Sequence, residues 1–333
     1  MSVVALDDIR MVQKRILGRV QQTPLVTSDT LSARSGFPVR LKLESHQPTG
    51  SFKLRGATNA VLSLSDEAKK RGLVTASTGN HGRALAHAAK AEGARAVICM
   101  SALVPANKVD AVKALGADVR IVGRSQDDAQ EEVERLVRKE GMTAIPPFDH
   151  ADVIAGQGTI GLEIAEAQPE TELVLVPLSG GGLASGIAAA IKGTLPRARV
   201  IGISMERGAA MHESLRAGKP VAVEELETLA DSLGGGIGLQ NRYTFAMCRD
   251  LLDDVVLLTE EEIAAGIRHA FAAEGEVVEG AGAVGIAALL AQKVEVRGPT
   301  VIVVSGRNID ERLHASIVKS DRAAANAAGG KGR

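Results

Sequence analysis

The feature that most constrains the fold is a regular alternation of short apolar runs with helical segments. In the first half of the chain, apolar runs at 73–77, 94–100 and 118–122 are separated by helical patterns at 83–92 and 106–115. The second half repeats this alternation with four further apolar runs, at 172–177, 200–204, 254–258 and 300–304. Strands that alternate with helices predict parallel βαβ units, and therefore an α/β fold.

A stiff connector at 146–150, which reads Pro-Pro-Phe-Asp-His, separates the two series. We therefore predict two α/β domains, each a mostly parallel sheet flanked by helices, with a cleft between them. The small, polar and glycine-rich residues 321–333 are expected to form a disordered tail.

Composition excludes several classes of function. A net charge of −1 and only 2% aromatic residues argue against a nucleic-acid partner. No run approaches the 18 apolar residues of a membrane span, and 1–20 has the pattern of an amphipathic helix rather than a signal peptide. Cys99 and Cys248 lie in apolar stretches and suggest reduced, buried thiols. We expect a cytoplasmic protein with no membrane partner.

Lys53 is the first candidate for chemistry. Pro48 and Gly50 indicate a turn, and Ser51 is a candidate N-cap for a helix over 52–64. The positive end of a helix dipole would disfavour the charged amine and favour a nucleophile. The alternative is a surface lysine in the first turn of an amphipathic helix.

Two loops that follow predicted strands are candidate binding sites. Residues 179–182, Ser-Gly-Gly-Gly, lie between a strand and a helix, where backbone N–H groups can hold a phosphate. A dinucleotide site, with Glu206 after the next strand, and a tight packing turn are the alternatives. Asn80 and His81 lie at another such loop, which suits a carboxylate or is a turn capped by asparagine. With Lys53, these loops suggest pyridoxal phosphate held as a Schiff base.

Five motifs extend this pattern along most of the chain. In order, they are 51–57 (SFKLRGA), 77–82 (STGNHG), 154–159 (IAGQGT), 177–183 (PLSGGGL) and 305–308 (SGRN). In this order they resemble the fold-type II pyridoxal-phosphate enzymes, in the threonine/serine dehydratase and serine racemase family. The resemblance runs from about residue 5 to about residue 320. It implies a tryptophan synthase beta-like fold, in which residues 1–65 and 150–320 form a large domain that binds pyridoxal phosphate. Residues 72–145 would form a small domain on the substrate side.

The resemblance also implies roles for the matching residues. Lys53 would carry the cofactor and then serve as the base on the substrate Cα, and Phe52 would pack against the ring. Asn80 would hydrogen-bond the 3′-oxygen of the ring, and Ser305 the ring nitrogen. The phosphate would be held by the residues of the glycine loop, which are Ser179, Gly180, Gly181, Gly182 and Leu183.

On the substrate side, the resemblance implies that Ser77, Thr78 and His81 bind the carboxylate. Thr78 is also a candidate catalytic residue, because serine racemases resemble one another in having a serine there as a second base. The extra methyl group of threonine crowds the site, which makes racemisation less favourable. Arg307 replaces a glycine of the family pattern, and it either reaches a further anionic or carbonyl group of the substrate or faces solvent.

Two further departures concern a metal and the ring. Glu206 and the carbonyl of Ala210 match two positions of a metal site in this family, but His212 replaces the usual acidic third ligand. We therefore expect no metal site. Ser232 stands where a glycine often covers the ring. The sequence Ser-Gly-Arg-Asn is similar to the branch of hydroxyectoine-utilisation dehydratases.

The resemblance implies a homodimeric dehydratase, an ammonia-lyase that removes water from a β-hydroxy amino acid. The products would be a 2-oxo acid, or its enamine precursor, and ammonia. A serine hydroxyl at the ring nitrogen does not keep it protonated, which favours elimination over transamination. The alternatives are an amino acid racemase or β-replacement synthase of the same fold, a nicotinamide-dependent oxidoreductase, or a non-catalytic binding relative.

Overall fold

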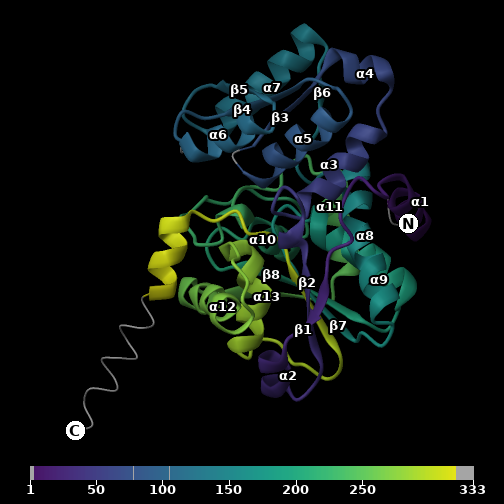
Figure 1. Ribbon diagram of the computed structural model, residues 1–333, viewed down its shortest axis with the longest axis vertical. Helices are drawn as coiled ribbons and strands as arrows, with labels where there is room; N and C mark the ends of the chain where they lie inside the picture. Colours follow the sequence, from purple (N-terminus) through teal and green to yellow (C-terminus); the bar gives the residue numbers. More distant parts are fainter. Residues whose placement is uncertain (1–3, 78, 105, 320–333) are drawn as a thin grey trace.

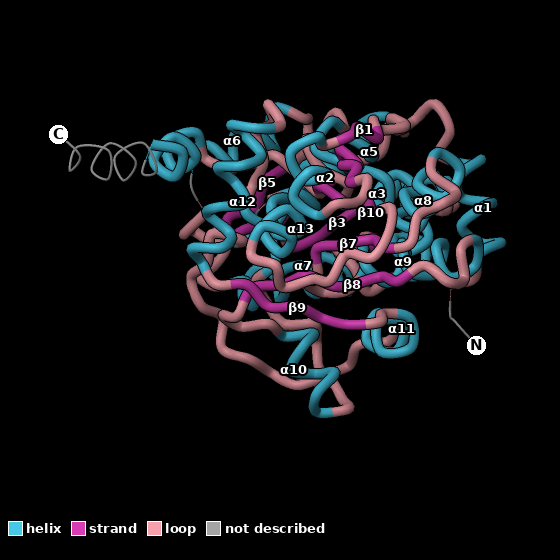
Figure 2. The backbone as a smooth tube through the Cα atoms, turned by 90° about the horizontal axis from the view of Figure 1, so that it is seen from below, coloured by secondary structure: helices cyan, strands magenta, loops and turns pink. Residues whose placement is uncertain are grey.

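The computed structural model describes residues 4–77, 79–104 and 106–319. Within them, the strands form two separate sheets (Figure 1). The larger sheet has the order β1-β2-β10-β7-β8-β9, and Figure 2 shows β10, β7, β8 and β9 following one another across it. Its strands are β1 (Leu25–Thr27), β2 (Val39–Leu43), β7 (Leu173–Pro177), β8 (Arg199–Met205), β9 (Asp254–Leu258) and β10 (Thr300–Val304). All neighbours are parallel except β1 and β2.

Strand periodicity divides the core of the larger sheet between its two faces. Val301 and Val303 of β10 pack in one apolar cluster, while Ile302 and Val304 pack in another. Successive strand residues point to opposite faces, so an uninterrupted apolar strand requires helices on both sides. The first cluster includes residues of α8 (Ala151–Ala167), α9 (Gly182–Thr194) and α11 (Thr244–Leu251). The second includes residues of α2 (Asp29–Ser35), α12 (Glu260–Ala273) and α13 (Gly280–Leu290).

The smaller sheet has the order β5-β4-β3-β6, and all of its neighbours are parallel. Its strands are β3 (Leu73–Ala76), β4 (Ala96–Met100), β5 (Asp118–Ile121) and β6 (Thr143–Ala144). The helices around it are α3 (Lys53–Leu62), α4 (Asp66–Arg71), α5 (Asn80–Ala91), α6 (Ala106–Ala114) and α7 (Gln126–Glu140). The predicted α/β class, with mostly parallel sheets flanked by helices, is confirmed.

Helix α3 lies between α5 and α8 and so touches both parts of the molecule. It crosses α8 where Gly56 meets Gly156, and a Cβ added to Gly156 would lie 2.5 Å from the Cα of Gly56. Two glycines let the backbones approach this closely. The first residue of α3 is Lys53.

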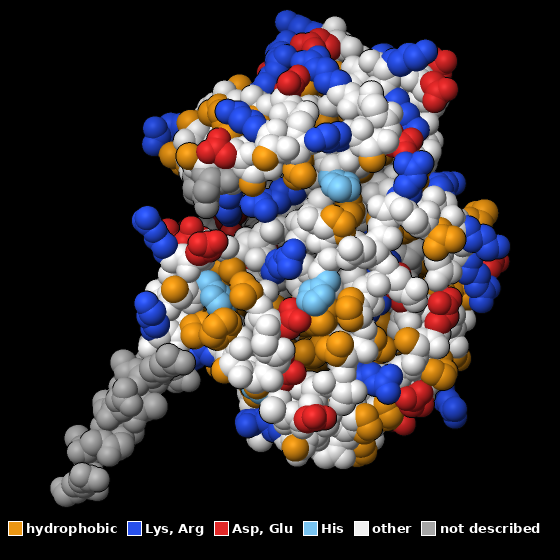
Figure 3. Space-filling model, viewed as in Figure 1, with side chains coloured by type: hydrophobic (Ala, Val, Ile, Leu, Met, Phe, Trp, Pro, Cys, Tyr) orange, Lys and Arg blue, Asp and Glu red, His pale blue; other side chains and the backbone are white. Residues whose placement is uncertain are grey.

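The remaining elements are α1 (Leu6–Arg15), α10 (Ala210–Ala217) and the short 3₁₀ helices η1 (Glu44–His46) and η2 (Asp231–Leu233). Residues 311–319 are also helical. Among the described residues, no helix combines the length and apolar character needed to cross a bilayer. On the face shown in Figure 3, Lys and Arg side chains are interspersed with Asp and Glu side chains.

Three expectations on local structure need correction or lie outside the structure. The helix expected from residue 83 begins at Asn80, so Asn80 and His81 lie in its first turn instead of before it. The N-cap of α3 is Phe52, and the buried hydroxyl of Ser51 has no partner among the described residues. The tail at 321–333 lies outside the described residues, and the domain boundaries stay a prediction.

Candidate active site

Three loops at carboxyl ends of strands, those after β3, β7 and β10, carry most of the predicted site residues. The loop after β10 meets the segment before α3 directly. The Phe52 N–H donates to the carbonyl of Ser305 at 3.0 Å, and Ser51 forms an antiparallel bridge with Gly306. The same loop reaches α5 through Asn308, whose Nδ2 lies 2.5 Å from the Oδ1 of Asn80. These contacts bring Lys53, Asn80 and Ser305 into one region.

The amine of Lys53 has an enclosed position at this region. Its Nζ donates to the carbonyl of Pro147 at 2.7 Å and lies 5.2 Å from the centre of the Phe52 ring. Burial lowers the pKa of Lys53 to about 8, although the carboxylate of Glu279 opposes this shift. The expected depression of the pKa is therefore present, but its main cause is burial instead of the helix dipole. A larger fraction of this amine is neutral near pH 7 than for an ordinary lysine.

The glycine loop between β7 and α9 presents a row of free N–H groups. Among the described residues, the N–H groups of Gly180, Gly181, Gly182 and Leu183 have no acceptor. Gly181 has φ +88°, a conformation that favours glycine. The loop stands at the N-terminus of a 13-residue helix, where the dipole favours an anion. The cradle fits a phosphate group.

Phe148 of the connector packs against this cradle. A Cβ added to Gly180 would lie 2.5 Å from ring atoms of Phe148, and one added to Gly182 would lie 3.0 Å from the Phe148 backbone. Asp149 then caps α11, because its carboxylate accepts from the backbone N–H groups of residues 242, 243 and 244. The connector and the phosphate cradle therefore form one packed unit.

The first turn of α5 offers a site for a carboxylate. The Oγ of Ser77 accepts from the Gly82 N–H at 3.0 Å, whereas the N–H groups of Asn80 and His81 have no acceptor among the described residues. The imidazole of His81 is 3% exposed and donates from Nε2 to the carbonyl of Ile145 at 2.8 Å.

Burial, together with the charge of Lys53, lowers the pKa of His81 to about 3. The imidazole is therefore neutral, and a carboxylate here would meet backbone N–H groups instead of an imidazolium. Thr78 lies outside the described residues.

Ser305 and Arg307 differ in burial. Ser305 is 2% exposed, and its Oγ has no partner among the described residues, which leaves it free for a ring nitrogen. Arg307 is exposed, and its backbone N–H donates to the carbonyl of Gly50. The side chain of Arg307 contacts no other described residue through a hydrogen bond or ion pair. A contact between Arg307 and the substrate stays a prediction.

Glu206 and His212, which match positions of a metal site in the family, have polar contacts with neighbouring side chains. Glu206 lies 3.7 Å from the Nζ of Lys293, and the Nδ1 of His212 lies 3.1 Å from Glu213. Within the described ranges, no three His, Cys, Asp or Glu side chains form a group able to hold a metal ion.

Glu279 is a central residue that the sequence patterns did not indicate. It is 3% exposed, and its carboxylate accepts from Asn80 Nδ2 at 2.7 Å and from the Asn308 N–H at 3.1 Å. Burial and the charge of Asp231 raise the pKa of Glu279 to about 7, although both of these hydrogen bonds oppose the shift. In the sequence, only the position of Glu279 directly before an apolar helix marked it.

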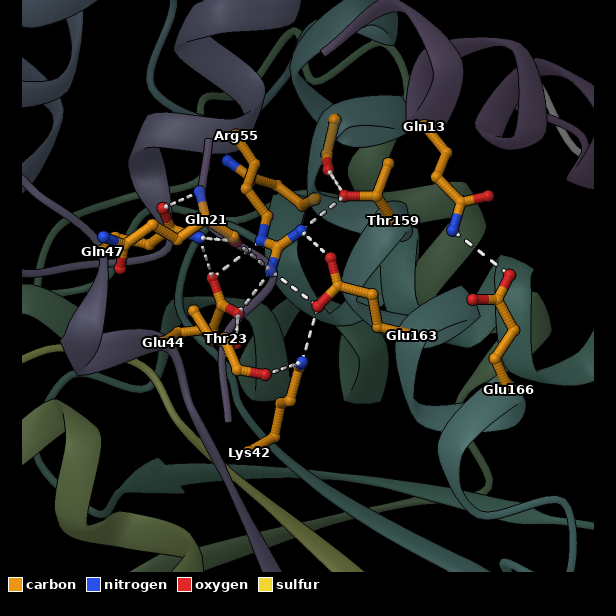
Figure 4. A network of polar contacts seen from close by, with 12 residues as sticks. Gln13, Gln21, Thr23, Lys42, Glu44, Gln47, Arg55, Thr159, Glu163 and Glu166 are labelled. Atoms are coloured by element: carbon orange, nitrogen blue, oxygen red, sulfur yellow. Dashed lines mark hydrogen bonds and ion pairs between the residues drawn. The ribbon is translucent and has the colours of Figure 1, made fainter. Parts of the chain in front are cut away.

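A buried network of charged side chains anchors α3 (Figure 4). Arg55, which is 1% exposed, pairs with Glu44 at 2.8 Å and with Glu163 at 2.5 Å, and Lys42 also pairs with Glu163 at 2.5 Å. Two positive and two negative charges therefore balance inside the protein. The network joins α3 to β2 and α8 two residues beyond the candidate amine.

Comparison with known proteins identifies the family. Residues 16–306 match the family described as "Pyridoxal-phosphate dependent enzyme", so the chain belongs to it. A curated relative from Sinorhizobium fredii, "Putative threonine dehydratase", is 61% identical over 96% of each chain. An "L-threonine ammonia-lyase" from Thermotoga maritima is 42% identical over 96% of this chain and 80% of the relative. The structure of maize serine racemase superposes with a TM-score of 0.89 at 34% identity, covering 96% of this chain and 98% of the other.

The predicted resemblance and the prediction of a pyridoxal-phosphate-dependent lyase are therefore confirmed. Membership of this family also argues against the alternative of a nicotinamide-dependent oxidoreductase. The described residues fit the cofactor, since an enclosed amine, a free row of N–H groups at a helix start and an unpaired serine hydroxyl lie at adjoining loops. The roles of the individual residues are taken up as proposals below.

Proposed function

We propose that the chain is a dehydratase that removes water from a β-hydroxy amino acid and releases ammonia and a 2-oxo acid. The observation that carries this proposal is the enclosed Lys53 amine, with its pKa lowered to about 8, beside two helix starts that offer free N–H groups. When bound, pyridoxal phosphate supplies an electron-withdrawing ring that acidifies the Cα–H of an attached amino acid.

Each of the chain's own groups has a defined task in this proposal. The free N–H groups of α9 hold the phosphate, and those of Asn80 and His81 hold the substrate carboxylate. The neutral form of Lys53 Nζ takes the proton from Cα. The hydroxyl of Ser305 meets the ring nitrogen without protonating it, which keeps the ring a weaker electron acceptor and favours departure of a β-hydroxyl. Ser77 and Thr78 complete the carboxylate side.

Two observations bear on the substrate. The relatives named threonine dehydratase and L-threonine ammonia-lyase support threonine or serine. The Ser-Gly-Arg-Asn sequence supports a hydroxylated diamino acid derived from hydroxyectoine, with Arg307 contacting its additional anionic or carbonyl group. Likeness to maize serine racemase supports racemisation as the second candidate activity.

A homodimer, a cytoplasmic setting and the lack of a resident metal stay predictions.

The test begins with the purified protein and its visible absorption. We expect a yellow protein whose band is abolished by borohydride and is missing in Lys53→Ala; a colourless protein that takes up no pyridoxal phosphate refutes the proposal. Release of 2-oxo acid and ammonia is then measured with serine, threonine, 3-hydroxyaspartate and hydroxylated diaminobutyrate derivatives. Chiral chromatography on the same samples separates elimination from racemisation. Racemisation without elimination would establish the second candidate.

Arg307→Gly tests the substrate contact. If the guanidinium meets an additional anionic or carbonyl group, kcat/KM for the substrate that carries this group falls about tenfold or more, while threonine is affected little. Arg312→Ala, an exposed position five residues later, is the control. Equal effects on all substrates would show that Arg307 only faces solvent or supports the loop.

A further inference from the structure

Three residues form a hydrogen-bonded unit that joins the two parts of the molecule. They are Asn80, Glu279 and Asn308. Asn80 comes from α5 beside the smaller sheet, whereas Glu279 precedes α13 and Asn308 follows β10 of the larger sheet. Asn80 Nδ2 donates to Glu279 Oε1 at 2.7 Å, Asn308 Nδ2 donates to Asn80 Oδ1 at 2.5 Å, and the Asn308 N–H donates to Glu279 Oε2 at 3.1 Å. Each member is therefore bonded to both of the others.

Two neighbours of Asn308, one that can only accept a hydrogen bond and one that can only donate, fix the orientation of its side-chain amide. Its Nδ2 also donates to the carbonyl of Thr49 at 3.0 Å, and a carbonyl can only accept. Its Oδ1 accepts from Nη1 of Arg83 at 3.1 Å, and a guanidinium can only donate. The Asn308 amide therefore has one favourable orientation, with Nδ2 toward Asn80.

The same argument then fixes Asn80. It meets a donor at Oδ1, from Asn308, and an acceptor at Nδ2, from Glu279. A flipped amide would face donor to donor on one side and acceptor to acceptor on the other. Asn80 is 8% exposed, so little water is available to compensate for lost bonds. An amide nitrogen carries two hydrogens, and Glu279 takes only one of them.

We propose that Glu279 and Asn308 are positioning residues that lock the Asn80 amide so that its remaining Nδ2–H is held for an oxygen acceptor of the cofactor ring. The inference rests on the proposed function, in which Asn80 bonds the ring oxygen. It goes further because it explains why a carboxylate is buried here. In its ionised form a carboxylate can only accept, and it therefore holds Asn80 Nδ2 in place.

The variant Glu279→Gln tests this lock with almost no change in shape. Glutamine has one acceptor and one donor, whereas Glu279 accepts at both oxygens. The backbone N–H of Asn308 can only donate, so the side-chain oxygen of the new glutamine faces this N–H. The NH₂ group of the glutamine then faces Asn80. The Asn80 amide then loses its fixed polarity. The matched control is Glu276→Gln, three residues earlier, whose carboxylate bonds His46 at 3.0 Å.

The readout is the absorption spectrum of the holoenzyme, because the ratio of visible to near-ultraviolet absorption reports the hydrogen bonding of the ring oxygen. We expect Glu279→Gln to change this ratio about fivefold, as the loss of one hydrogen bond implies, and Glu276→Gln to leave it unchanged. The unfolding midpoint is measured on the same samples. A lower midpoint with an unchanged ratio would show a structural role only and overturn the proposal.

A double-variant cycle with Asn80→Ala tests the route of the effect. If Glu279 acts through Asn80, Glu279→Gln changes the ratio no further in the Asn80→Ala background. An equal change in both backgrounds would overturn the proposal. Should Glu279→Gln fail to fold, Asn308→Ala removes the donor to Asn80 Oδ1 and is expected to shift the ratio in the same direction. A wild-type protein that binds no pyridoxal phosphate would instead refute the proposed function itself.

Discussion

Replacing Arg55 by methionine should destabilise the protein strongly, because Arg55 balances buried carboxylates. The substitution keeps an unbranched apolar stem but leaves Glu44 and Glu163 with only Lys42 as a positive partner. One negative charge is then unpaired in the interior. Breaking a buried pair in this way costs about 3–5 kcal/mol. Arg10→Met, which removes an exposed ion pair with Asp7, should cost about 0–1 kcal/mol.

The pH dependence of this loss tests the electrostatic cause. In the wild type, burial alone would raise the pKa of Glu44, but Arg55 and Lys42 bring it below its ordinary value. The wild-type contribution of Glu44 is therefore constant between about pH 7 and pH 5 and is lost only at lower pH. Without Arg55, burial raises the Glu44 pKa above its unfolded value, so the penalty is largest at neutral pH and falls with acidification. Over two pH units, up to about 2.7 kcal/mol is recovered, at about 1.36 kcal/mol per unit.

The assay is urea unfolding followed by far-ultraviolet circular dichroism, since the chain contains no tryptophan. The double variant Arg55→Met with Glu44→Gln leaves only Lys42 and Glu163, which neutralise each other. We expect it to be more stable at pH 7 than the single variant, and its stability relative to the wild type should vary less with pH. Two outcomes would refute the electrostatic reasoning. One is a difference in the free energy of unfolding between the wild type and Arg55→Met that does not become smaller on acidification, and the other is a double variant no more stable than the single one.

Three other predictions concern the candidate site. Gly180→Ala should abolish retention of pyridoxal phosphate, measured as bound cofactor per chain, because the added Cβ would lie 2.5 Å from the ring of Phe148. Removing the cofactor and following its rebinding should show a rate that rises with pH and levels off above about pH 8, because the pKa of Lys53 is lowered to about 8 by burial and only the neutral amine attacks a carbonyl. Asp149→Ala should lower the free energy of unfolding by about 1–2 kcal/mol, because the N-terminus of α11 loses its capping carboxylate.

Each of these predictions has a control and a contrary outcome. Gly236→Ala lies in an open loop, and it should retain the cofactor; equal loss in both glycine variants would remove the argument from Phe148. A rebinding rate that still rises steeply near pH 10 would mean that the Lys53 amine is not enclosed in the cofactor-free protein. Asp250→Ala removes an exposed pair with Arg249 and should change stability little. If it matched Asp149→Ala, the capping argument would fail.

The regular part of the fold could be predicted from the sequence because its signal is local. The apolar run of β10 lies at Thr300–Val304, as expected, and the six other strands predicted from apolar runs begin within two residues of their predicted positions. The short elements could not be predicted in this way. The three-residue strand β1 and the two-residue strand β6 are too short to show a hydrophobic periodicity of their own. They form because neighbouring strands offer free backbone hydrogen-bonding groups. Helices α2, α4 and α10 were missed as well.

The candidate site was predicted where its residues lie in motifs and missed where long-range contacts define it. The Asn80–Glu279 and Lys53–Pro147 bonds join residues 199 and 94 positions apart. His81 illustrates another limit. Its motif indicated a polar contact with substrate, but only the packing around it shows a neutral imidazole committed to a carbonyl. Burial, which sets these protonation states, is a property of the assembled fold.

The path of the chain between the sheets has a consequence for cleaved protein. All strands of the smaller sheet come from the continuous stretch 73–144, whereas in the larger sheet β2 lies between β1 and β10. A single protease cut within that stretch would give two fragments that share the larger sheet, since β2 belongs to the first and β10 to the second. Parallel pairing of Val39–Leu43 with Thr300–Val304 would hold the fragments together. The nicked protein should therefore migrate as one particle in gel filtration and separate only in denaturant.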